Sequence, residues 1–127
     1  MARAMGCGSL IFALIAAGCG GPTTYSAAKT RACLAAHGAK VGGKLDFVAS
    51  SATGGAFVVS LGDNSVKLVF GQTVADAAAI VAAYERFAFA NVRPGLADVL
   101  RRYDNAVTLW HEHPADGDLS LVVGCFR

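Results

Sequence analysis

The spacing of apolar side chains predicts three helices, over residues 25–37, 73–87 and 94–103. In each segment, apolar residues recur every three or four positions, so that they line one face of a helix. Gly38 follows the first segment, at a position where helices commonly end. Thr73 opens the second with an acidic residue three positions later, which is similar to a capping box. The third segment starts at a proline, a residue favoured in the first helical turn.

Other segments alternate between apolar and polar residues, which predicts strands. The five predicted strands cover residues 45–50, 56–61, 66–70, 106–111 and 119–126. The second and third are separated by Gly62-Asp-Asn-Ser65, whose residues favour turns, so they are expected to form a hairpin. The last two are separated by 113–118, which contains Pro and Asp-Gly and indicates a loop.

These elements predict an α+β fold in the order α-β-β-β-α-α-β-β. Strands joined by short turns pair antiparallel, so we expect an antiparallel sheet with helices packed on one face. Residues 25–127 would form a single domain. We expect its large aromatic side chains to be core residues, among them Phe87, Phe89, Trp110 and Phe126.

Composition agrees with one packed domain and argues against a nucleic-acid partner. The chain has 127 residues, of which 54% are hydrophobic and 16% are charged. Its formal net charge is +2, and it falls to +1 if the segment that contains Arg3 is removed. So small a charge gives no electrostatic footprint for nucleic acid.

The first 18 residues have the layout of a secretory signal peptide. Arg3 supplies a positive start, 10–17 form a short apolar run, and small residues precede Cys19. A membrane-spanning helix needs about 20 apolar residues, more than twice the length of this run. The segment is therefore predicted to direct export and then to be removed.

The end of this segment, Ala16-Ala17-Gly18-Cys19, resembles the lipobox of bacterial lipoprotein precursors. The resemblance implies that diacylglycerol is attached to Cys19, which becomes the first residue of the mature chain, and that residues 19–24 form a short tether. The protein would then lie in the cell envelope, where the lipid would anchor it to the outer face of the membrane. The membrane would thus be its partner. Two alternatives stay open: a secreted protein cut after Gly18, and a cytosolic protein whose N-terminal helix is buried.

The cysteine count fits the lipobox resemblance. Of the four cysteines, Cys7 lies in the predicted signal peptide, and lipid on Cys19 would leave Cys33 and Cys125 as one pair. The pair would close a loop of roughly 90 residues, which the chain-entropy model values at about 4 to 5 kcal/mol. We therefore predict one disulfide that joins the first helix to the last strand.

Two histidines near the end of the fourth predicted strand suggest a metal site. On a strand, His111 and His113 would point the same way, about 6 to 7 Å apart, and could ligate one metal ion. Asp116 or Asp118 in the adjoining loop could supply a third ligand. His37, in the last turn of the first predicted helix, is explained more simply by the favourable interaction of a histidine with a helix C-terminus.

The sequence contains no catalytic constellation and implies no cofactor. Its carboxylates are scattered, and no nucleophile elbow or phosphate-binding glycine motif is present. The stretches 31–34, 46–50, 107–110 and 124–126 are loosely similar to small secreted or lipid-anchored bacterial domains of unknown function, a resemblance that implies no substrate. We expect a non-enzymatic domain that binds a protein, glycan or small molecule. The alternative is a metal-binding protein or metal-dependent hydrolase that uses His111 and His113.

Overall fold

The computed structural model describes residues 24–127. The predicted signal peptide, the lipidation residue Cys19 and all but the last residue of the tether lie outside the described residues. In chain order the elements are α1 Ala27–Ala36, β1 Lys40–Val41, α2 Phe47–Ser50, β2 Ala56–Leu61, β3 Asn64–Phe70, α3 Val74–Phe87, the 3-10 turn η1 Arg93–Gly95, α4 Leu96–Val99, β4 Leu100–Tyr103, β5 Ala106–Trp110 and α5 Asp116–Gly124.

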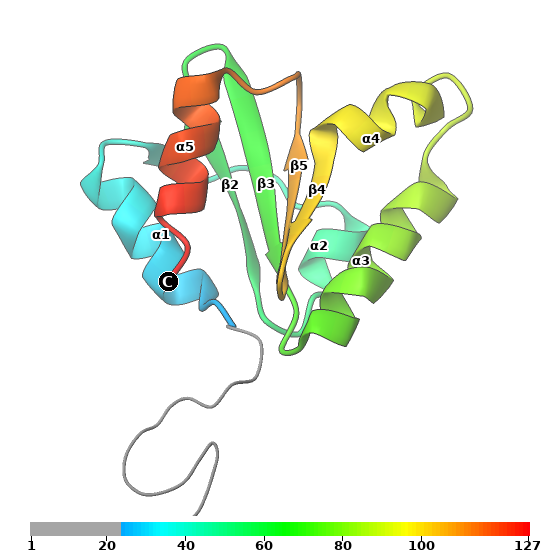
Figure 1. The fold of residues 1–127 in the computed structure, drawn as a ribbon, viewed down its shortest axis with the longest axis horizontal. Helices are drawn as coiled ribbons and strands as arrows, with labels where there is room; N and C mark the ends of the chain where they lie inside the picture. Colours follow the sequence, from blue (N-terminus) through cyan, green and yellow to red (C-terminus); the bar gives the residue numbers. More distant parts are fainter. Residues whose placement is uncertain (1–23) are drawn as a thin grey trace, which may run out of the picture.

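The strands form one antiparallel sheet in the order β1-β2-β3-β5-β4, which confirms the α+β class. Helices cover both faces, however: α1 and α5 lie on one, α2 and α3 on the other (Figure 1). The expectation of helices on one face was wrong. The central strand β3 shows why both faces are covered: Leu68 and Phe70 face α1 and α5, whereas Val69 faces α3. All three side chains are fully buried, so each face needs a cover.

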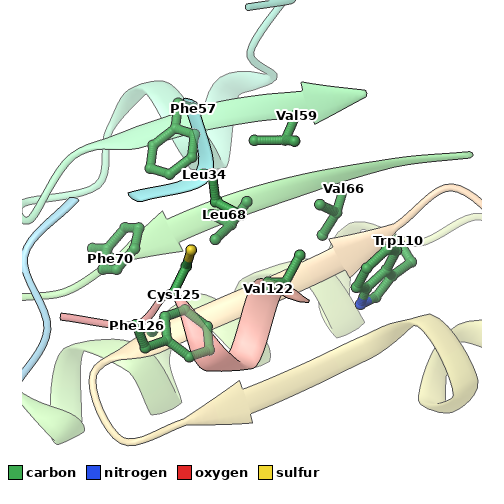
Figure 2. Packing of buried hydrophobic residues seen from close by; sticks show 11 residues of the cluster. Leu34, Phe57, Val59, Val66, Leu68, Phe70, Trp110, Val122, Cys125 and Phe126 are labelled. Carbon is green, nitrogen blue, oxygen red and sulfur yellow. The ribbon is translucent and has the colours of Figure 1, made fainter. Parts of the chain in front are cut away.

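The larger part of the core lies between the sheet and the pair α1 and α5 (Figure 2). It includes the predicted core residues Trp110 and Phe126, which are 2% and 7% exposed. The predicted disulfide is present at its edge, because Cys33 of α1 and Cys125 after α5 are bonded with their Cα atoms 5.5 Å apart. The disulfide joins two helices, whereas we expected it to join a helix to a strand.

The elements with strong local signals are confirmed. Helix α3 begins with a complete capping box, in which Thr73 accepts from the N–H of Asp76 and Asp76 accepts from the N–H of Thr73. The β2–β3 hairpin forms as expected, although its turn contains only two residues, because β3 begins at Asn64. Gly62 occupies that turn with a φ of 62°, in the left-handed region that glycine adopts without strain.

The predicted strand over 45–50 is instead the single helical turn α2. Asp46 caps the turn by accepting a 2.8 Å hydrogen bond from the N–H of Ala49. At the other end, the hydroxyls of Ser50 and Ser51 donate to the carbonyl of Phe47. Three alternating apolar residues were too short a pattern to outweigh these local side-chain bonds.

The predicted strand over 119–126 is also helical, as α5. Val122, Cys125 and Phe126 are buried, whereas Val123 is 39% exposed, so burial follows helical rather than alternating spacing. Two acidic residues, Asp116 and Asp118, lie in its first turn, where they interact favourably with the helix dipole. The element order expected from the sequence is therefore wrong at both of these positions.

The third predicted helix is split into a helical and an extended part. Its first part forms η1 and α4, but 100–103 form strand β4, which pairs antiparallel with β5. The connection is the tight turn Asp104–Asn105, with Asp104 at a φ of 53°. Asn105 is buried and donates to the carbonyls of Tyr25 and Gly71, which fixes this turn against the start of the domain. Arg101 and Arg102, which fall within the third predicted helix, therefore lie on a strand.

Candidate functional site

A groove of about 740 Å³ lies over the face of the sheet that α2 and α3 cover. Its floor includes Val58 of β2, Lys67 of β3 and Leu109 of β5, three residues whose side chains point to this face. Its walls are α2, the C-terminal end of α3, and the segment 88–99. A groove of this size lies within the range that binds small molecules in proteins.

Four large apolar residues that line this groove are exposed to solvent. Phe47, Phe87, Phe89 and Val92 have exposed fractions of 78%, 60%, 77% and 48%. The expectation that Phe87 and Phe89 are core residues was wrong. The last turn of α3 diverges from the sheet (Figure 1), so the apolar stripe of this helix continues past the part that the sheet can cover. Exposed apolar patches on small proteins are characteristic of binding surfaces.

A polar cluster lies within the groove, where Asp46 contacts both Lys67 and Tyr84. The Lys67 ammonium forms an ion pair with Asp46, and the Tyr84 hydroxyl lies 3.0 Å from each Asp46 carboxylate oxygen. Since Asp46 also accepts from the N–H of Ala49, one carboxylate joins α2, β3 and α3. The cluster therefore holds the groove walls in position.

The same contacts set the charge states of the cluster. Burial alone would raise the pKa of Asp46, but the hydrogen bond from Lys67, aided by those from Ala49 and Tyr84 and by the lysine charge, lowers the pKa below its usual value. Burial, followed by the charge of Asp46 and their hydrogen bond, raises the pKa of Tyr84. Asp46 is thus an anion and Tyr84 a protonated donor at neutral pH, so Asp46 is an engaged acceptor rather than a free base.

We predict that Asp46→Asn lowers the free energy of unfolding by about 1 to 2 kcal/mol at pH 7, after allowance for partial exposure of the carboxylate. Because the pKa of Asp46 is lowered on folding, its contribution is complete above the pKa of the unfolded state and disappears as the pH falls through the folded value. Thermal melts of the two proteins should therefore converge as the pH is lowered from 7 to 3.

The matched control is Asp63→Asn, in the exposed β2–β3 turn, which should melt close to the parent protein across the same pH range. A gap between Asp46→Asn and the parent protein that stays constant down to pH 3 would contradict this assignment.

The two histidines that were predicted to bind one metal ion have different neighbours. His111 follows β5 and lines the groove. His113 points elsewhere, with its Nδ1 2.7 and 2.9 Å from the carboxylate oxygens of Asp98. Within residues 24–127, neither histidine belongs to a group of three metal-ligand side chains with ligand atoms less than 4.8 Å apart. Asp116 and Asp118, the suggested third ligands, lie in the first turn of α5.

The described part of the chain does contain one such group, formed by Cys33, His37 and Cys125. Both sulfur atoms are bonded to each other, which leaves His37 as the only available ligand of the three. His37 caps the C-terminus of α1, where its Nδ1 lies 2.9 Å from the carbonyl oxygen of Cys33. This agrees with the simpler interpretation of His37 as a residue that interacts with a helix end.

Comparisons with known proteins assign no family: no protein-family model matches the chain, and neither a curated protein nor a solved structure is significantly similar to it. None of the helices within residues 24–127 has the length and apolar character needed to cross a bilayer. The groove is therefore the feature of the described residues that indicates a function.

The groove was not predicted from the sequence, although the sequence contains one feature that indicates exposed aromatic residues. Phe87 and Phe89 flank the end of a predicted helix just before Asn91 and Pro94, where a chain usually leaves its sheet. Two aromatic residues at such a point have few core residues to pack against. Phe47 gave no signal of this kind, since its exposure depends on α2, which was predicted to be a strand.

Proposed function

We propose that this protein is a lipid-anchored component of the cell envelope and that its domain binds a ligand in the groove without catalysing a reaction. The observation that carries the binding part is the groove itself, with Phe47, Phe87, Phe89 and Val92 exposed along it. Removing such side chains from water stabilises a complex by about 25 cal/mol for each square ångström that is covered. The anchoring part is supported by the apolar leader and the lipobox-like end at Cys19.

Asp46 is the one carboxylate among the described residues that line the groove, and it is engaged by protein partners. All contacts of the Asp46 carboxylate serve to hold Lys67, Tyr84 and the turn α2. A general base must instead be free to accept a proton from a substrate. We therefore assign binding, rather than chemistry, to this face.

A metal-dependent activity of His111 and His113 is the alternative proposal. The contact with Asp98 leaves Nε2 of His113 free to ligate a metal. The proposal has less support because, within residues 24–127, neither histidine belongs to a group of three ligand side chains close enough to share one ion. Metal analysis of protein purified without a histidine tag separates the two proposals. Binding in the groove requires no metal, whereas the alternative requires one metal ion per chain that is lost in His111→Ala and His113→Ala.

The groove is tested with a neutral apolar dye, N-phenyl-1-naphthylamine, whose fluorescence rises when it leaves water. We expect saturable binding to detergent-free protein, and about tenfold weaker binding to the double variant Phe87→Ser, Phe89→Ser, which removes two apolar contacts. Both residues are exposed, so the variant should keep its melting temperature.

Val123→Ser provides the matched control, since Val123 is an exposed apolar residue of α5 on the opposite side of the sheet. Its dye affinity should equal that of the parent protein. Equal affinity of the groove variant and the parent protein, or no dye binding at all, would contradict the proposed function.

A further inference from the structure

Both lysines that line the groove lie on its α2 and β3 side. Lys44 precedes α2, and Lys67 of β3 pairs with Val58 of the adjacent strand β2. The segment 88–99 lines the side over β5 and β4 and contributes Phe89 and four aliphatic residues, Ala88, Val92, Leu96 and Val99. Ser65 and His111 line the groove as well, but its two lysines lie on one side, so an anionic group of a ligand would find its charge complement there.

The lysine side of the groove carries an uncompensated positive charge. Asp46 and Lys67 neutralise each other, and the Tyr84 hydroxyl donates to the same carboxylate. Lys44 is exposed and takes part in none of the ion pairs found in residues 24–127. An anionic head group could reach Lys44 without displacing an existing partner.

The floor of the groove favours an alkyl chain over an extended peptide. Strands β2, β3 and β5 each pair with a strand on both sides, and the edges of the sheet are β1 and β4. A peptide laid across this face would find no strand edge for its N–H and C=O groups, and leaving such groups buried without partners is costly. An alkyl chain has no polar groups that need partners.

From the unpaired Lys44 beside an exposed apolar lining we infer that the ligand is a single-chain amphiphile with a carboxylate head, that is, a fatty acid. This inference rests on the proposed function and adds to it the class of ligand. The carboxylate pairs with Lys44, and the alkyl chain lies along Phe87, Phe89 and Val92. A volume of about 740 Å³ is in the range for one ligand of this size.

Dodecanoate is the probe, measured by calorimetry at pH 8 below its micelle concentration and compared with 1-dodecanol and dodecyltrimethylammonium. The expected order of affinity is carboxylate, alcohol, ammonium, with a difference of about threefold to fivefold between carboxylate and alcohol from one exposed ion pair. From octanoate to dodecanoate, each added methylene should strengthen binding about threefold to fourfold.

Lys44→Ala should bring the affinity for dodecanoate down to that for dodecanol and leave dodecanol binding unchanged. Lys40→Ala, which removes an exposed lysine of β1 that does not line the groove, should change neither affinity.

Three outcomes overturn the inference and leave the proposed function intact. Equal binding of dodecanoate and dodecanol to the parent protein would show that the head group is not recognised. Binding of the naphthylamine dye but of no dodecyl compound, or displacement of the dye only by an apolar helical peptide, would show that the ligand is not an alkyl chain. Loss of dye binding together with all amphiphile binding would instead reject the groove itself.

Discussion

Replacing both bonded cysteines, as Cys33→Ala with Cys125→Ala, should lower the melting temperature by roughly 20 °C. The disulfide connects residues 92 positions apart and thus constrains nearly the whole described chain in the unfolded state. The chain-entropy model gives about 4 to 5 kcal/mol for a loop of this length. Small domains have limited cores, so a loss of this size is a large part of their total stability.

Thermal melts with and without a reducing agent check this prediction. The parent protein should lose stability on reduction, whereas the double variant should melt at the same lowered temperature in both conditions. Ellman titration under denaturing conditions should find Cys33 and Cys125 oxidised in native material. Free thiols at Cys33 and Cys125 in native material would contradict the prediction that the disulfide forms in the cell. A double variant as stable as the parent protein would contradict its predicted contribution to stability.

Cys19→Ala should move the protein from the membrane fraction to the soluble fraction of its native host. The two acyl chains of a diacylglyceryl cysteine make membrane attachment effectively permanent, and no other anchor is proposed for this chain. Mass spectrometry of the membrane-bound protein should find Cys19 as the N-terminal residue with its acyl chains attached.

Cys7→Ala is the matched control, because it removes a cysteine from the segment predicted to be cleaved and should leave the protein in the membrane fraction. A Cys19→Ala variant that stays in the membrane fraction would refute lipidation at this residue. An unprocessed chain recovered from the cytosol would refute export as well.

Local signals account for the parts of the fold that the sequence predicted correctly. The capping box at Thr73, the turn at Gly62 and the alternation along β2 and β3 each specify their element within a few residues. The cysteine count predicted the disulfide, because it depends on the number and the compartment of the cysteines rather than on the elements that carry them.

The errors occurred where a short apolar pattern fits two structures. Residues 119–126 alternate like a strand, yet Val122, Cys125 and Phe126 also have helical spacing, and packing against the sheet decided between them. Residues 100–103 were predicted to be helical, but a tight turn at Asp104 allows them to pair with β5 as a strand. In both places the outcome depends on contacts far away in the sequence.

The groove depends on contacts between residues far apart in the sequence. Its residues were therefore not predicted. Phe47 is exposed because α2 forms, and α2 is held by the contacts of Asp46 with Lys67 and Tyr84, 21 and 38 residues further on. Phe87 is exposed because the last turn of α3 diverges from the sheet (Figure 1). A site built in this way becomes visible only once the sheet is assembled.

The measurement that tests the central claim most directly is an NMR titration of the ¹⁵N-labelled protein with N-phenyl-1-naphthylamine. The groove proposal predicts saturable shift changes that are largest at Phe47, Phe87 and Phe89, together with little change in α1 and α5. Shift changes concentrated on the α1 and α5 face, or spectra unaltered by the dye, would contradict it.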